Sequence, residues 1–198
     1  MAEDATFPRL VSLACHDLRT PLATIAGFAH TLSRLDGLAP PADRFVEMMI
    51  TASGEMAQLL DGLGLLARIE GGGYQPTPVE TDSLELAQRA GARVGADKVD
   101  VQGAGGAVAV DPEAAEHALY GLARCAVRHG PVERLTIFAE GAELRVSPVT
   151  PAAAPVVMAR EIKDLGAAVG LSVVRALGGS AELDGETLVV RLPRSAAY

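Results

Sequence analysis

The strongest constraint on the fold is an apolar spacing of three and four that runs through two neighbouring segments, residues 7–38 and 41–69. On an α-helix this spacing gathers the apolar side chains on one face, which in the first segment includes Leu18 and Leu22. The stretch between the segments contains Gly37, Pro40 and Pro41, which end one helix before the next begins. The sequence therefore predicts an antiparallel hairpin of two long helices.

A single hairpin of this kind cannot cover the apolar faces of both of its helices. Two hairpins paired as a four-helix bundle cover them, and a homodimer is the simplest such arrangement. Apolar residues make up 49% of the chain and tryptophan is absent, so the core is expected to be aliphatic. We expect residues 1–72 to form this dimeric hairpin.

The pattern changes beyond a glycine- and proline-containing linker at residues 71–78. Helix-like and strand-like segments then follow one another, with glycines between the shorter ones. Helices are predicted at residues 82–94, 111–129 and 156–177, and strands at 98–102, 107–110, 135–139, 144–147, 180–183 and 187–192. This order predicts an α+β chain whose second domain, residues 76–198, is a two-layer α/β sandwich.

Charge and cysteine content exclude several classes of function. The formal net charge is −8 with no cluster of Lys and Arg, which argues against nucleic acid and an anionic membrane surface as partners. No stretch reaches the roughly 18 consecutive apolar residues of a membrane span. Cys15 and Cys125 show neither metal-ligand spacing nor a disulfide framework, so we expect reduced thiols, no metal site and a cytoplasmic protein.

Residues 16–22, His-Asp-Leu-Arg-Thr-Pro-Leu, carry the candidate chemistry within the first predicted helix. His16 lies two residues from Leu18 of the apolar face, about 200° around the helix axis, so its imidazole is expected to face solvent. Thr20 lies four residues after His16 and therefore on the same side of the helix. Pro21 stands inside the helix, where it removes a backbone hydrogen bond at a cost of roughly 3 kcal/mol.

The polar members of this segment suit phosphoryl chemistry. A neutral imidazole at His16 is a nucleophile near neutral pH, and the carboxylate of Asp17 favours one of its tautomers. Arg19 offers a cation for phosphoryl oxygens, and the hydroxyl of Thr20 can orient a water. The catalytic residues are therefore predicted to be His16, Asp17, Arg19 and Thr20.

The segment resembles the phosphoacceptor box of sensor histidine kinases, and residues 59–71 are similar to the end of that family's dimerisation hairpin. The resemblance implies that His16 is the phosphoacceptor and that Asp17 assists its phosphorylation. It also implies that Thr20 matches a residue with which some family members dephosphorylate their partner.

The second domain resembles the family's ATP-binding domain in outline, at residues 110–113, 170–174, 178–179 and 187–193. The motifs for ATP chemistry are nevertheless largely missing. Gly121 and Cys125 stand where the family has its Mg²⁺-binding asparagine motif, and a neutral thiol is a poor ligand for this hard cation. Val-Ser-Pro-Val-Thr-Pro at residues 146–151 replaces the adenine-recognising loop, and the glycine-rich lid survives only in part at residues 166–171.

This combination predicts a bundle-type histidine phosphotransferase with a degenerate ATPase-like domain. A phosphoryl group would pass between His16 and an aspartate of a response regulator receiver domain, without ATP-dependent autophosphorylation. The chain is expected to bind no cofactor, the receiver to bring its own Mg²⁺, and a hybrid or sensor kinase to act upstream. The predicted docking residues are Arg19, Thr20, Ala23, Thr24 and Gly27.

Three alternatives stay open from the sequence. The chain could be a response-regulator phosphatase that uses Asp17 and Thr20 to position a water, with no need for phosphohistidine. It could be a non-catalytic pseudokinase that binds a receiver or a true kinase, although a pure scaffold has no physical need for His16. Saturable binding of Mg-ATP would instead indicate an ATP-dependent kinase.

Overall fold

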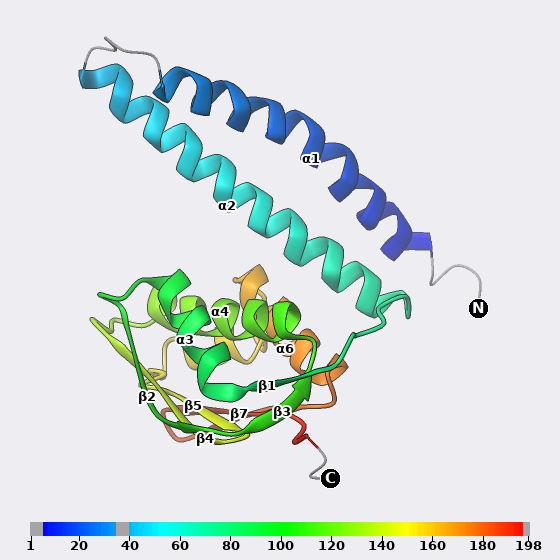
Figure 1. Ribbon diagram of the computed structural model, residues 1–198, viewed down its shortest axis with the longest axis vertical. Coiled ribbons are helices and arrows are strands. Elements are labelled where there is room, and N and C mark those ends of the chain that lie inside the picture. The colour runs from blue at the N-terminus through cyan, green and yellow to red at the C-terminus, as the bar shows by residue number, and fades with distance from the viewer. Residues whose placement is uncertain (1–5, 35–39, 196–198) are drawn as a thin grey trace. The chain divides into compact units, whose positions relative to one another are not determined.

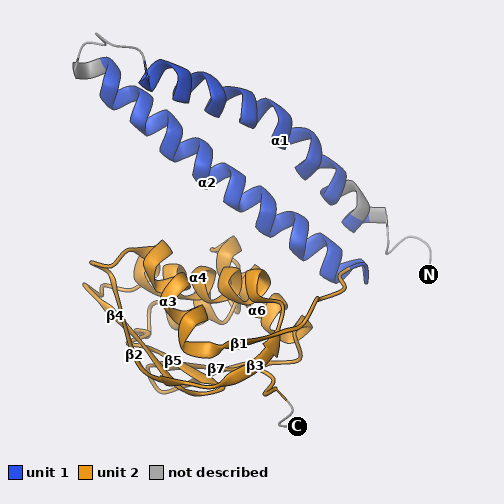
Figure 2. Cartoon of the chain, in the orientation of Figure 1, with its two compact units in different colours: residues 1–73 blue, residues 74–198 orange. Residues whose placement is uncertain are grey.

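The computed structural model describes residues 6–34 and 40–195. The chain divides into two compact units, Met1–Gly73 and Tyr74–Tyr198 (Figure 2). The predicted turn around Gly37 lies largely outside the described residues.

The first unit is a hairpin of two long helices, α1 (Thr6–Ser33) and α2 (Pro40–Glu70), which pack side by side (Figure 1). The buried side chains of α1 recur every seven residues, at Cys15, Leu22 and Ala29, a spacing with which one helix face can stay against a partner helix. The buried side chains of α2 are less regular and include Val46, Ser53, Leu65 and Ala67. The predicted helical hairpin is confirmed.

A second apolar row on each helix is not covered by the hairpin. Leu18, Ile25 and Leu32 are exposed on α1, and Phe45, Met49, Met56 and Leu59 on α2. The sequence analysis placed Leu18 and Leu22 on one common face, whereas the structure buries Leu22 against α2 and leaves Leu18 55% exposed. The reason is that each helix carries two adjacent apolar rows, and only one can face a single partner helix.

The second unit is built on a five-stranded sheet with the order β2-β4-β5-β7-β6. Its strands are β2 (Val99–Gly105), β4 (Leu135–Gly141), β5 (Glu143–Ser147), β6 (Ser180–Asp184) and β7 (Thr187–Arg191). β2 and β4 are parallel, and the other neighbours pair antiparallel as two hairpins joined edge to edge.

The helices of this unit lie on one face of the sheet, which gives two layers (Figure 1). They are α3 (Ser83–Val94), α4 (Pro112–His129), the short α5 (Ala154–Val157) and α6 (Leu165–Ala176). Between the layers lies an aliphatic core that includes Leu86, Leu119, Leu122, Ile137 and Leu188, all fully buried. The predicted α+β fold with a two-layer second domain is confirmed.

A short strand, β1 (Val79–Asp82), was not predicted from the sequence. It pairs antiparallel with β3 (Ala107–Val110). Three of its four residues are exposed, so it lacks the alternating apolar pattern that signals a strand. Its last residue, Asp82, accepts hydrogen bonds from the backbone N–H groups of Leu84 (2.8 Å) and Glu85 (3.2 Å) and thereby caps α3.

The helix predicted at residues 156–177 is two helices, α5 and α6. The backbone leaves the helical region at Ala159, whose φ is 49°. A new helix then begins after Asp164, whose Oδ1 accepts from the backbone N–H of Ala167 at 3.1 Å. The apolar spacing continues through both helices, which is why the break was not visible in the pattern.

Helices α4 and α6 approach so closely that their contact requires glycine. A Cβ added to Gly121 of α4 would lie 2.4 Å from the carbonyl oxygen of Gly166, and one added to Gly170 would lie 2.8 Å from that of Ala118. Cβ atoms do not come this close to backbone atoms in real proteins. The two helices can therefore pack at this separation only because glycine stands at the contact.

We expect Gly121→Ala to weaken the second unit. Alanine gains up to about 1 kcal/mol in helix propensity, but overpacking of this kind typically costs about 1–3 kcal/mol. Hydrogen exchange read by mass spectrometry should show faster exchange in α4 and α6. Gly54→Ala, on α2 with nothing within 4 Å of the new Cβ, is the control and should leave α4 unchanged. Unchanged exchange in Gly121→Ala would contradict the close approach.

Candidate functional site

His16 stands on the outward face of α1, with 76% of its side chain exposed. The local reason is its place beside Cys15, which is buried against α2, so the next side chain turns about 100° away from the hairpin interior. Its Nδ1 lies 3.1 Å from Oδ1 of Asp17. When Nδ1 carries the proton and donates to this carboxylate, Nε2 keeps a lone pair that can react with a partner from solvent.

Arg19 is already paired within the hairpin. Its Nη2 donates to Oδ1 of Asp61 on α2 at 2.7 Å, and both side chains are about half exposed or more. Exposed pairs of this kind are worth up to about 1 kcal/mol, so the guanidinium can exchange this partner for a stronger anion. Asp61 was not among the predicted site residues, because a pairing across 42 residues leaves no signal in the local pattern.

The structure brings most of the predicted docking residues together in one open hollow on α1. His16, Arg19, Thr20, Ala23 and Thr24 line it. The hydroxyl of Thr24 donates to the backbone carbonyl of Thr20 at 3.2 Å. Gly27 is not part of the lining, and the space where its side chain would be is open.

The segments of the second unit that were compared with the ATP-binding motifs of the family are apolar or closely packed. Cys125 is fully buried on α4. Burial, assisted by the negative charge of Asp164, raises the pKa of its thiol to about 12. Val146 and Val149 of the segment that replaces the adenine loop are also buried. Gly121, beside Gly166, has no room for a larger side chain.

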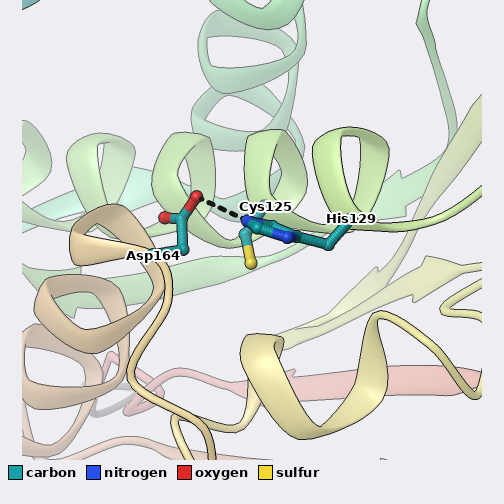
Figure 3. Close-up of side chains that lie close together, drawn as sticks. All are labelled: Cys125, His129 and Asp164. Atoms are coloured by element: carbon teal, nitrogen blue, oxygen red, sulfur yellow. Dashed lines mark hydrogen bonds and ion pairs between the residues drawn. The ribbon is translucent and has the colours of Figure 1, made fainter.

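Asp164 is a polar residue of this region that the sequence analysis did not single out. Its Oδ2 lies 3.3 Å from Nε2 of His129 and 4.0 Å from Nη1 of Arg128. Figure 3 shows that Asp164 and His129 point toward each other, with the sulfur of Cys125 beside them. The signal that could have revealed Asp164 was its position before an apolar helical segment, which is typical of an N-cap.

Comparison with protein families gives a match within the first unit. Residues 9–72 match the family model described as the His Kinase A (phospho-acceptor) domain. The phosphate regulon sensor protein PhoR of Pseudomonas aeruginosa is 38% identical over 77 residues. This alignment covers 37% of the present chain and 17% of PhoR, so the chain corresponds to a small part of that protein.

Solved structures share the fold of the chain at low sequence identity. Full-length ShkA, crystallised in complex with AMPPNP, superposes with a TM-score of 0.66 at 19% identity over 96% of this chain and 47% of its own. Histidine kinase AdeS of Acinetobacter baumannii gives 0.58 at 16% identity over 91% and 98%. The ATP binding domain of PrrB from Mycobacterium tuberculosis gives 0.50 at 24% over 60% and 98%.

Within the described residues, no helix is both long and apolar enough to cross a membrane.

The raised pKa of Cys125 makes a prediction about stability at high pH. Between the ordinary thiol value of 9.0 and about 12, the unfolded chain releases this proton and the folded chain keeps it. Stability from this group is therefore present below pH 9 and lost as the pH rises toward 12. Melting temperatures of chelator-treated protein measured from pH 8 to pH 11 should fall more steeply than those of Cys125→Ala. Parallel curves would contradict a buried, protonated thiol.

Proposed function

We propose that this chain is a histidine phosphotransferase, the function predicted from the sequence. Residues 9–72 match the His Kinase A phospho-acceptor domain, and the chain shares its fold with sensor histidine kinases. His16 accepts a phosphoryl group from the aspartate of one receiver domain and passes it to another, without making phosphohistidine from ATP. The observation that carries this proposal is the exposed imidazole of His16, held by Asp17 on a packed helix.

The geometry supports in-line transfer. Nε2 of His16 attacks the phosphorus of the receiver's aspartyl phosphate, the bond between phosphorus and the carboxylate oxygen breaks, and the carboxylate leaves with the electron pair. The ring then carries a positive charge, which the neighbouring carboxylate of Asp17 stabilises through the Nδ1 proton. The receiver supplies its own Mg²⁺ in this scheme, so the hairpin needs to hold no cofactor for the transfer.

Arg19 provides positive charge beside the reacting histidine. Its guanidinium lines the same hollow as His16 and reaches α2 through Asp61. Phosphoryl oxygens are strong acceptors for a guanidinium. In this proposal Asp61 keeps Arg19 ordered at the rim of the hollow until a phosphorylated receiver offers a better anion.

Three features of the second unit support the absence of ATP chemistry. The sulfur of Cys125 is buried at a position where Mg²⁺ would need an oxygen ligand. Gly121 and Gly166 bring α4 and α6 into backbone contact. The segment at residues 146–151 places valines in the core. We therefore propose that this unit is a structural or docking module and not a kinase domain.

The apolar row left uncovered on the hairpin supports a homodimer. Domains of this family dimerise, and two-component kinases interact with response regulators. In our proposal the exposed Leu18, Ile25 and Leu32 of α1 meet a second hairpin, which leaves His16 and its hollow for the receiver domain.

A second function is favoured by the position of Thr20. Its side chain lines the hollow four residues from His16, where its hydroxyl can orient a water toward an aspartyl phosphate. Hydrolysis of the receiver's phosphate would then accompany transfer. Mutation of Thr20 should reduce the hydrolysis, and mutation of His16 should abolish the transfer.

We expect the full chain to become labelled in an acid-labile form only from a phosphorylated receiver protein, and not from Mg²⁺ and radiolabelled ATP alone. His16→Ala should abolish the label, because it removes the nucleophile. His30→Ala removes the other exposed histidine of α1 and should change labelling by no more than about twofold. Label from ATP alone would make the chain a kinase, and label on His16→Ala would remove the proposed acceptor.

We expect Thr20→Ala to retain transfer to His16 while loss of phosphate from the receiver slows by about tenfold or more, since positioned proton-transfer groups contribute roughly 10²–10⁴-fold. Thr31→Ala, which deletes another exposed hydroxyl of α1 bonded only to a helix carbonyl, is the matched control. Equal phosphatase rates in both variants would exclude Thr20 from water positioning.

A further inference from the structure

Three side chains with metal-ligand chemistry meet at the junction of α4 and α6. Cys125 and His129 lie four residues apart on α4 and so on one face of the helix, while Asp164 comes from the residue that caps α6. Their ligand atoms all lie within 4.8 Å of one another. Figure 3 shows the imidazole of His129 and the carboxylate of Asp164 facing each other, with the sulfur of Cys125 beside the imidazole.

The surrounding structure holds these groups in place. Oδ1 of Asp164 accepts from the backbone N–H of Ala167 at 3.1 Å, which directs Oδ2 toward Nε2 of His129 at 3.3 Å. The separation of the two helices is set by the glycine contact at Gly121 and Gly166. Cys125 is fully buried and 9% of the Asp164 side chain is exposed. A ligand set this constrained needs little reorganisation to bind an ion.

We propose that Cys125, His129 and Asp164 bind one zinc ion, through the thiolate sulfur, an imidazole nitrogen and a carboxylate oxygen, with water as the fourth ligand. Mixed sulfur, nitrogen and oxygen donors in tetrahedral arrangement are the preferred surroundings of Zn²⁺. Mg²⁺ and Ca²⁺ are disfavoured, because both require oxygen ligands in larger number. The side chain of His129 is 23% exposed, so the cluster reaches solvent on the side of its imidazole.

The carboxylate of Asp164 provides negative charge within 4.8 Å of the other two ligand atoms. When Zn²⁺ binds, the thiol of Cys125 releases its proton to solvent as the sulfur–metal bond forms. Nη1 of Arg128 lies 4.0 Å from Oδ2 of Asp164, and the Arg128 side chain is 66% exposed and can turn into solvent.

The ion would link the last turn of α4 to the first turn of α6. This role is independent of the chemistry at His16, which belongs to the other unit. The sequence analysis predicted no metal site, since Cys-x-x-x-His alone offers two ligands and the third lies 35 residues further along.

The test uses the full chain, stripped with a chelator and titrated with Zn²⁺ against a chromophoric competitor, and with Co²⁺ as a spectroscopic probe. We expect one ion per chain, a sulfur-to-Co²⁺ charge-transfer band, the d–d bands of tetrahedral Co²⁺, and no competition from millimolar Mg²⁺. Loss of groups that only support a ligand costs roughly 10–100-fold in affinity. Cys125→Ser and Asp164→Asn should therefore weaken Zn²⁺ by at least about 100-fold, and Asn still caps α6.

Cys15→Ser and His30→Ala are the matched controls, because each removes a possible ligand of the hairpin, and neither should change the affinity by more than about twofold. Circular dichroism establishes that each variant is folded. Should Cys125→Ser fail to fold, the charge-transfer band of the unaltered chain and the affinity of Asp164→Asn decide the matter. The proposal is wrong if Zn²⁺ does not bind saturably, if the Co²⁺ complex lacks the sulfur band, or if a control variant loses the site.

Discussion

The packing of α1 against α2, through side chains of α1 spaced by seven residues, is the constraint on which the candidate site depends. It buries Cys15 and Leu22 against α2, and the side chain between them at position 16 consequently faces solvent. The same packing brings Asp61 to Arg19, which places a positive charge beside His16 without burying it. A nucleophilic imidazole on a packed helix needs no movement of the backbone to meet a partner.

The second constraint is the contact of α4 with α6 at glycine positions. The axes of two packed helices normally lie about 8–10 Å apart, because side chains fill the space between them. Gly121, Gly166 and Gly170 remove those side chains at the contact. One consequence is that α4 and α6 are closely packed in the part of this unit that resembles the family's nucleotide site. The other is that Asp164, at the start of α6, reaches Cys125 and His129 at the end of α4.

The two units therefore differ in how far their candidate sites depend on tertiary packing. The site on the hairpin is local, since His16, Asp17 and Thr20 come from little more than one turn of helix and depend on the rest of the unit only for rigidity. The cluster in the second unit is assembled from two helices that are far apart in the chain, and it exists only when both are packed. A phosphoacceptor unit of the first kind can keep its geometry whatever happens to the nucleotide chemistry of the second.

The sequence alone determined the hairpin, the phosphoacceptor segment and the two-layer second domain, because helical periodicity and a seven-residue motif are properties of neighbouring residues. Tertiary structure decided which of two apolar rows faces α2, so that Leu18 is exposed where the pattern placed it with Leu22. It also decided the pairing of Arg19 with Asp61, the strand β1 against β3, and the meeting of Asp164 with Cys125 and His129. Each of these joins residues far apart in the chain, and local spacing carries no record of which distant segment packs against which.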